Sequence, residues 1–237
     1  MRIESILFGE TKAYQRMAQV LERSCKENSP NTPITIRRIE SADEELFHMG
    51  KKKVRTYIDN ARKTKHHRNI VLEAKDGELI GLLDCDMMVL KDLSPVEHYN
   101  FDFAFTPRPQ GSHRLINSGA VFVRVSDKTR DWYIRWYENV EKLFRDDKLF
   151  VKWSKLFGGV NQSSLGMLLT EPHDLQLEEL TCLEWNLIYD HWKKFNPMVT
   201  RIVHIQGVLK EACVGKGRAT QPEVRRLVPI WRSFERQ

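Results

Sequence analysis

The sequence lacks any long apolar run. No stretch approaches the roughly 20 consecutive apolar residues that a membrane-spanning helix needs. The first ten residues, MRIESILFGE, predict a β-strand and contain no apolar signal core followed by a cleavage site. These absences argue against a membrane-spanning or secreted protein, and we expect a soluble, cytoplasmic one.

Cysteine is also scarce, and the four cysteines show no C-x-x-C spacing. They are Cys25, Cys85, Cys182 and Cys213. Without a metal-binding or redox spacing, reduced and buried thiols are the expected state. Internal repeats and low-complexity segments are absent as well. Apolar residues make up 41% of the 237, a share that supports a substantial core and argues against disorder.

The excess of one charge sign is modest. Lysine and arginine number 38 against 32 acidic residues, which gives a net charge of +6. Such a balance favours anionic ligands such as nucleotides, nucleic acid or an acidic membrane surface. It is equally consistent with solubility alone.

Strand and helix patterns alternate along the chain. Apolar alternation predicts strands at residues 3–8, 34–39, 102–106, 119–125 and 201–205, and a buried strand ends at LIGLLD, residues 79–84. Helices are predicted after a Thr11 cap, over the basic residues 49–68, after Ser126 and over 161–171. Strands separated by helices indicate an α/β fold with a mainly parallel sheet flanked by helices, whose ligands bind beyond the carboxyl ends of the strands.

Two aspartates follow the buried strand directly. Asp84 and Asp86 stand at i and i+2, so an extended backbone points both carboxylates to one side. Their repulsion is removed by a divalent cation such as Mg²⁺ or Mn²⁺, for which carboxylates are suitable ligands. Taken alone, D-x-D at a strand end is explained as well by a solvated turn.

Three later stretches carry polar residues that are suited to binding a metal ion, a phosphate or sugar hydroxyls. HIQGVLK contains His204, a nitrogen ligand for Mn²⁺, then Gly207, and then Lys210, a cation suited to phosphate. A buried, hydrogen-bonded histidine is the alternative. Asn117 in LINSG can bind sugar hydroxyls or simply form a turn. The pair Asn161–Gln162 lies at a predicted helix start, where Asn161 is alternatively an ordinary N-cap.

In chain order, LLDCD, NSG, NQ, CLEWN and HIQGVLK resemble the motifs of GT-A-fold glycosyltransferases, in particular the glycogenin and lipopolysaccharide galactosyltransferase type. The resemblance spans most of the chain. It implies a single GT-A (Rossmann-like) domain over residues 1–237, with a nucleotide-sugar half up to 92 and an acceptor half over 93–237. It also implies Mn²⁺ or Mg²⁺ as the cofactor and transfer of a sugar from a nucleoside diphosphate, in particular a UDP-sugar, to a hydroxyl acceptor.

The resemblance assigns roles position by position. Asp84, Asp86 and His204 match metal ligands, and Asp84 also lies near the ribose. Lys210 matches a diphosphate contact and Tyr14 an aromatic ring against the uracil. The other implied donor contacts are Phe8, Gly9, Cys85, Gly207 and Arg62 or Lys63 toward the nucleotide, and Asn117, Asn161 and Gln162 toward the sugar.

The chain departs from this family at two positions. Asn161 stands where the family has the aspartate of an Asp-Gln pair, and this leaves the identity of the sugar open. Cys182 replaces the usual proline of the CLEWN segment. The H-x-x-G-x-x-K ending resembles the retaining branch. Because Glu184 is interpreted as a structural residue, same-face attack fits better than a glycosyl-enzyme intermediate.

The acceptor is indicated only by charge. Basic clusters occur at residues 51–55, 62–68, 108–114 and 216–226, so we expect a polyanionic acceptor such as a hydroxymethylated base in DNA, flipped out of the duplex. Lipopolysaccharide or protein acceptors remain open. Two other classes also remain: a nucleotide-sugar hydrolase, and a non-catalytic basic nucleic-acid-binding domain, which gives no reason for Asp84, Asp86 and His204 together.

Overall fold

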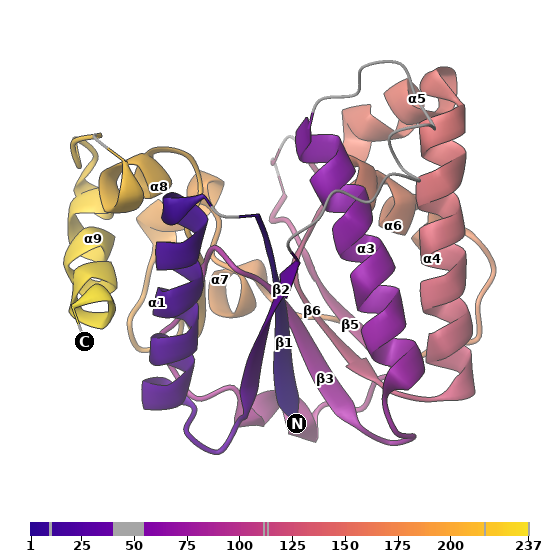
Figure 1. Ribbon diagram of the computed structural model, residues 1–237, viewed down its shortest axis with the longest axis horizontal. Coiled ribbons are helices and arrows are strands. Elements are labelled where there is room, and N and C mark those ends of the chain that lie inside the picture. The colour runs from indigo at the N-terminus through magenta and orange to yellow at the C-terminus, as the bar shows by residue number, and fades with distance from the viewer. Residues whose placement is uncertain (10, 40–54, 111, 113, 216, 237) are drawn as a thin grey trace. The chain divides into compact units, whose positions relative to one another are not determined.

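The predicted α/β fold class is confirmed by a computed structural model, which describes residues 1–9, 11–39, 55–110, 112, 114–215 and 217–236. A six-stranded, mainly parallel sheet has the strand order β2-β1-β3-β6-β5-β7 and is flanked by helices (Figure 1). A second sheet consists of β4 and β8. The chain divides into two compact units. They are Met1–Glu40, Gly81–Tyr99 and Leu180–Gln237, and Ser41–Ile80 and Asn100–Glu179.

The first unit is built on a parallel pair of strands and one long helix. Its elements are β1 (Arg2–Phe8), α1 (Lys12–Asn28), β2 (Ile34–Ile39), the end of β3 (Leu79–Asp84), β4 (Met87–Val89), η1 (Ser94–His98), α7 (Cys182–Trp185), η2 (Tyr189–Lys194), β8 (Ile202–His204), α8 (Gly207–Val214) and α9 (Pro222–Glu235). Thr11 takes the N-cap position of α1, as predicted. Its side chain makes no capping hydrogen bond, which corrects the predicted mode of capping.

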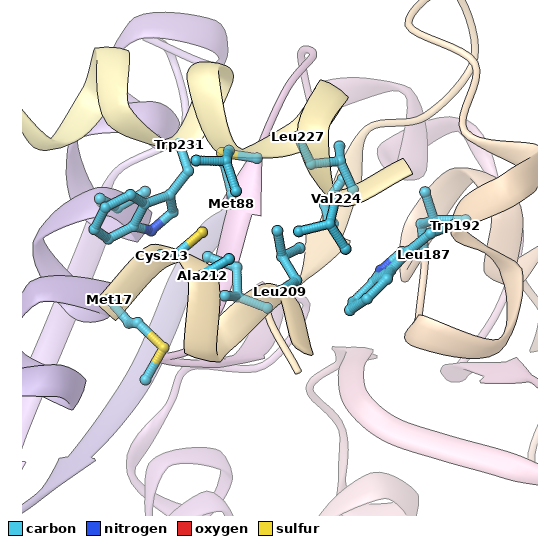
Figure 2. Packing of buried hydrophobic residues seen from close by; sticks show 14 of the residues in the cluster. Met17, Met88, Leu187, Trp192, Leu209, Ala212, Cys213, Val224, Leu227 and Trp231 are labelled. Atoms are coloured by element: carbon cyan, nitrogen blue, oxygen red, sulfur yellow. The ribbon is translucent and has the colours of Figure 1, made fainter. Parts of the chain in front are cut away.

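The core of this unit joins its two C-terminal helices to α1. In α9 the apolar residues recur every three or four positions, so one face is apolar and buried. Figure 2 shows Trp231 and Leu227 of this face beside Met88, with Leu209 and Cys213 of α8 nearby. Each large side chain buried here contributes about 1.5–3 kcal/mol to folding. This core supports β4 and β8, which carry or adjoin the polar residues of interest.

The second unit combines two helices of 19 residues and two of 11 with its strands. Its elements are α3 (Arg55–Glu73), the start of β3, β5 (Phe103–Pro107), β6 (Ile116–Arg124), α4 (Asp127–Arg145), α5 (Asp147–Phe157), α6 (Val160–Thr170) and β7 (Leu177–Glu179). The predicted basic helix over 49–68 is confirmed from Arg55 onward, and residues 49–54 lie outside the described part of the chain. β5 pairs antiparallel with β6 and parallel with β7.

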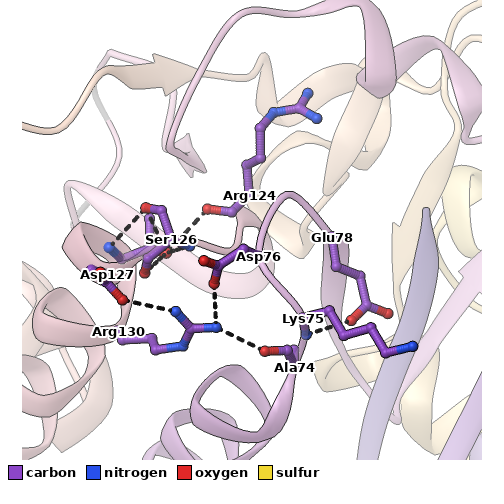
Figure 3. A network of polar contacts seen from close by, with 9 residues as sticks. Ala74, Lys75, Asp76, Glu78, Arg124, Ser126, Asp127 and Arg130 are labelled. Carbon is purple, nitrogen blue, oxygen red and sulfur yellow. Dashed lines mark hydrogen bonds and ion pairs between the residues drawn. The ribbon is translucent and has the colours of Figure 1, made fainter.

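Helix α4 is fixed at its start by side chains. Ser126 and Thr129 form a capping box, which satisfies backbone N–H groups that the first helical turn leaves without partners. One turn further on, Arg130 binds Asp76, Asp127 and the carbonyl oxygen of Ala74 (Figure 3). These contacts fasten the loop before β3 to the start of α4.

Two predictions from composition concern the cysteines and membrane-spanning helices. All four cysteines are buried and outside any disulfide, as predicted. Burial raises the pKa of Cys25 to about 11 and, with the nearby charge of Glu235, that of Cys213 to about 12. Among the described residues, no helix is both long enough and apolar enough to cross a membrane.

Candidate metal centre

Backbone pairing in the first unit brings Asp86 next to His204. β3 ends at Asp84, and after a two-residue turn β4 pairs antiparallel with β8, with Met87 opposite His204. The amide of Ile205 donates a hydrogen bond of 2.7 Å to the carbonyl oxygen of Asp86. Because successive residues of paired strands are held in register, this bond fixes the main chain on both sides of the site.

The three predicted metal ligands converge in the structure. His204 Nε2 lies 3.1 Å from an oxygen of Asp86 and 3.7 Å from one of Asp84, and one candidate ligand atom from each residue falls within 4.8 Å of the others. The imidazole is 2% exposed, whereas the Asp84 and Asp86 side chains are 21% and 17% exposed. The carboxylates therefore reach solvent, from which an ion can enter.

This set of side chains fits a divalent cation of the Mn²⁺ or Mg²⁺ kind. Ionised carboxylates have no hydrogen to donate, so two of them converging on one imidazole nitrogen favour a positive charge among them. A mixture of oxygen and imidazole ligands suits Mn²⁺ in particular. Cys85 and Asp86 do form a turn, as the alternative interpretation of D-x-D allowed, but the Asp86 carboxylate contacts the buried imidazole of His204 and is not surrounded by solvent alone.

Two residues that the sequence analysis did not assign also contact His204. Asn186 is fully buried, and its Oδ1 lies 3.1 Å from His204 Nδ1. Gln206 is partly exposed, and its amide nitrogen lies 3.0 Å from His204 Nε2. The sequence does contain a signal for Gln206, because it follows His204 by two residues, just beyond the end of the strand. For Asn186, 18 residues away, only its place in the CLEWN segment gave a signal.

The cationic and aromatic residues predicted for the nucleotide meet one another. Helix α8 begins at Gly207, and one turn later Lys210 places its ammonium 3.8 Å from the ring centre of Tyr14 in α1. Gly207 and Gly9 have φ values of +46° and +68°, a conformation that favours glycine, and a Cβ would meet no atom within 4 Å at either position. Their glycine character is therefore explained by backbone shape.

The remaining nucleotide candidates of the first unit adjoin the end of β1. Phe8 is the last residue of that strand, and the Gly9 amide donates to the carbonyl oxygen of Ile39. Cys85, between the two aspartates, packs its side chain with Leu7 and Ala18. Any contact that Cys85 makes with a ligand is expected to use its main chain.

The amide residues of the second unit correct two local predictions. Asn117 and Ser118 belong to strand β6, whereas the sequence analysis placed them in a loop before a strand starting at residue 119. The Asn117 side chain accepts from the Gly119 amide. The N-cap of α6 is Gly159, so the alternative of Asn161 as an N-cap is wrong; Asn161 donates to Ser118 Oγ across 2.8 Å.

Four further residues considered above are described by their surroundings within their own units. Gln162 donates to the carbonyl oxygen of Phe157. Arg62 in α3 is 7% exposed and lies 3.7 Å from Asp59, while Lys63 on the same helix is partly exposed. Glu184 accepts a 2.7 Å hydrogen bond from Arg201, an ion pair that supports its interpretation as a structural residue.

Comparisons with known proteins identify the fold. No family model and no curated protein sequence matches the chain. Among solved structures, the galactosyltransferase LgtC in complex with donor and acceptor sugar analogues superimposes with a TM-score of 0.63 at 12% identity, over 98% of this chain and 96% of that one. A glycosyltransferase involved in glycosylation of the PBCV-1 major capsid gives 0.59 at 16% identity, over 87% and 93%.

A third similar structure is GlyE of Streptococcus pneumoniae TIGR4. Its TM-score is 0.57 at 16% identity, and the match covers all of this chain but 60% of GlyE. These likenesses show that the chain has the GT-A fold of glycosyltransferases and resembles LgtC, as the sequence motifs implied.

Proposed function

We propose that this protein is a divalent-metal-dependent glycosyltransferase that moves a sugar from a nucleoside diphosphate, in particular a UDP-sugar, to a hydroxyl acceptor. The observation that carries the proposal is the convergence of Asp84, Asp86 and His204 on one point. A nucleic-acid-binding domain without catalysis gives no reason for that convergence. The likeness to LgtC supports the same conclusion, because that structure holds donor and acceptor sugar analogues.

The proposed chemistry follows from charge development. Cleavage of the bond between the anomeric carbon and the phosphate oxygen leaves negative charge on the departing diphosphate. Asp84, Asp86 and His204 would hold Mn²⁺ or Mg²⁺, which would supply Lewis-acid stabilisation of that charge on a usual scale of several kcal/mol. Lys210 adds a second cation, since its side chain reaches from α8 toward Tyr14.

Tyr14 and Lys210 have a defined relation in this proposal. The ammonium lies against the ring face, and such cation–π contacts are worth about 0.5–2 kcal/mol. We assign the ring to the uracil and the ammonium to the diphosphate, so donor binding moves Lys210 off the ring. Phe8, Gly9, Cys85, Gly207 and Arg62 or Lys63 stay predicted donor contacts, as Asn117, Asn161 and Gln162 stay predicted sugar contacts.

Retention of the anomeric configuration is proposed from the H-x-x-G-x-x-K segment. The one carboxylate considered as a nucleophile, Glu184, is engaged by Arg201. Attack from the same face, with the leaving phosphate accepting the acceptor's proton, therefore requires no covalent intermediate. The division into a donor half up to residue 92 and an acceptor half beyond it stays a prediction.

For the acceptor we propose a polyanion, with a hydroxymethylated base in DNA as the example to test. The support is the net charge of +6 and the basic cluster at residues 62–68 on α3. Lysine and arginine that neutralise phosphates make binding fall steeply with salt. Lipopolysaccharide and protein acceptors are the alternatives for the same reaction.

The decisive experiment is a panel of nucleotide sugars incubated with Mn²⁺ and read by the release of free nucleotide. Release that is abolished by a chelator and enhanced by an acceptor supports the transferase. Release that no acceptor enhances, with free sugar as the product, identifies a hydrolase instead. Without any release, and with salt-sensitive DNA binding, the non-catalytic alternative holds. Labelled sugar in hydroxymethylated DNA decides the acceptor.

A further inference from the structure

We propose that helix α5, with the segment beside its end, forms a docking surface for a bilayer that contains anionic lipids. The residues of this α5 surface are Leu115, Lys148, Val151, Lys152, Lys155 and Leu156. All of them belong to the second unit, and binding through them does not depend on the proposed transferase reaction. Exposed apolar side chains, lysines without acidic partners, and the grouping of both on one helix face support this assignment.

Helix α5 turns one face toward the core and the other toward solvent. Leu149, Phe150 and Trp153 pack against the core of the second unit, and Phe157 is buried. At about 100° per residue, five exposed residues fall within an arc of about 140° on the other side of the helix. Their order across this arc is Val151, Lys155, Lys148, Lys152 and Leu156. Lysines therefore occupy the middle of the exposed face, and an apolar side chain lies at each margin.

Three apolar side chains of the α5 surface are half exposed. Val151 is 53% exposed, Leu156 51% and Leu115 52%. Leu115 lies beside the end of α5, because its amide donates a 3.0 Å hydrogen bond to the carbonyl oxygen of Leu156. Arg114 fastens the same segment by donating to two carbonyl oxygens near the end of the helix. Single exposed apolar residues are common on proteins, but these three border one lysine-rich face.

The lysines of the α5 surface differ from the basic residues of the neighbouring helix. Four basic side chains of α4 form ion pairs, which are Lys128–Asp174, Arg130–Asp76, Arg135–Glu171 and Arg145–Glu141. Lys148, Lys152 and Lys155 have no carboxylate within ion-pair distance in the part of the chain that the structure describes. Asp146, before the helix, is engaged by the first backbone amides of α5. The positive charge of this face is therefore available to an anionic partner.

A bilayer with anionic lipids complements both parts of the α5 surface. Anionic headgroups attract the lysines, each of which contributes about fivefold to binding near such a surface, while the lysine stems extend over the apolar boundary. Val151, Leu156 and Leu115 then enter the layer between headgroups and acyl chains, as the apolar residues of interfacial helices do. The backbone of a nucleic acid pairs with lysines through its phosphates but leaves these aliphatic side chains in water. The lipid surface is therefore the occupant that accounts for both.

The first test uses the unaltered chain and the position of Trp153. Of the six tryptophans, Trp153 on α5 is the one that is not buried. We expect the protein to sediment with vesicles of phosphatidylcholine and phosphatidylserine, and less with phosphatidylcholine alone. Brominated acyl chains in the mixed vesicles should quench tryptophan fluorescence, and Trp153→Phe should lose this quenching. Failure to sediment with the mixed vesicles, or sedimentation without quenching, overturns the proposal.

The second test compares variants at exposed positions of the second unit. Lys148→Gln with Lys155→Gln should weaken binding to the mixed vesicles about 25-fold. Lys75→Gln with Lys128→Gln removes the same charge from exposed lysines elsewhere and should weaken it less than threefold. Equal losses overturn the proposal, because net charge alone then explains the binding. Val151→Thr with Leu156→Gln should weaken vesicle binding about tenfold and leave binding to a DNA duplex unchanged. Unchanged vesicle binding in this last variant, with DNA binding lost in the Lys148 and Lys155 variant, identifies a nucleic-acid surface instead.

Discussion

Replacing Asp86 by asparagine gives two effects of opposite sign, and the structure sets the size of each. In the metal-free protein the new side-chain amide lies where Asp86 now faces His204 Nε2 at 3.1 Å. It removes one of two neighbouring negative charges, and its carboxamide can still hydrogen-bond to the ring nitrogen. Relief of a like-charge contact between partly exposed groups is worth about 1 kcal/mol. For a chain of 237 residues this raises the melting temperature by about 2–4 °C.

The same substitution removes one of the three proposed metal ligands. At a Mn²⁺ concentration 100 times its dissociation constant, binding stabilises the unaltered protein by about 2.7 kcal/mol, or about 5–11 °C for a chain of this size. In Asp86→Asn the Mn²⁺-induced shift is expected to disappear at that concentration. The variant should therefore melt higher than the unaltered protein in chelator and lower in Mn²⁺.

The assay is thermal unfolding followed by far-ultraviolet circular dichroism, with chelator and with Mn²⁺. Asp131→Asn is the matched control, because this aspartate is 66% exposed on α4 and forms only a long ion pair of 3.9 Å with Arg135. It should behave as the unaltered protein under both conditions. An Asp86→Asn variant that is less stable in chelator, or that keeps the full Mn²⁺ shift, refutes the assignment of this site.

Three further predictions address other parts of the molecule. Lys210→Ala should lower kcat for donor cleavage and leave the acceptor KM unchanged, as steady-state kinetics will measure; an effect on acceptor KM alone contradicts its assignment to the diphosphate. His67 is buried, and burial, with the charges of Lys63 and His66, holds the pKa of its imidazole well below the ordinary value. As the pH falls, the unfolded chain therefore binds the proton at a higher pH than the folded chain does, so the free energy of unfolding falls below about pH 6.5 by up to about 1.4 kcal/mol per pH unit. Urea unfolding at several pH values should show a smaller dependence of this free energy on pH in His67→Phe. An unchanged dependence on pH contradicts the prediction. Finally, the buried thiols should react with a disulfide reagent at pH 8 only after denaturant is added, and rapid labelling of native Cys25 or Cys213 argues against their burial.

The sequence was most informative where local pattern and tertiary structure agree. LIGLLD is apolar because β3 is buried, and aspartates end it where the chain reaches a strand edge. Alternation in RIVHI likewise predicted β8 and placed His204 at its end. The order of the motifs along the chain then predicted that Asp86 and His204, 118 residues apart, lie together. Hydrophobic periodicity alone does not predict such a long-range contact.

The same reasoning failed where tertiary contacts override local preference. Asn-Ser-Gly favours a turn, yet Asn117 to Gly119 lie inside β6. The pairing with β5 shifts its register here and includes Asn117, and the Asn117 side chain accepts a hydrogen bond from the Gly119 amide. Helix α9 was not predicted, although its apolar residues have helical spacing; Pro222 and Pro229 obscure it, and only the first lies at a helix start. The role of Asn186 could not be predicted, because its partner His204 lies 18 residues further along the chain and their contact depends on the tertiary fold.

The pairing of β4 with β8 has a consequence for how the protein matures. Asp86 and its neighbour strand are synthesised long before His204, so a nascent chain lacks the third ligand until the last strand has docked. Binding of the proposed ion would then require that β8 has paired with β4, and a truncated product ending before residue 202 should fail to bind it even if the rest of the chain is compact.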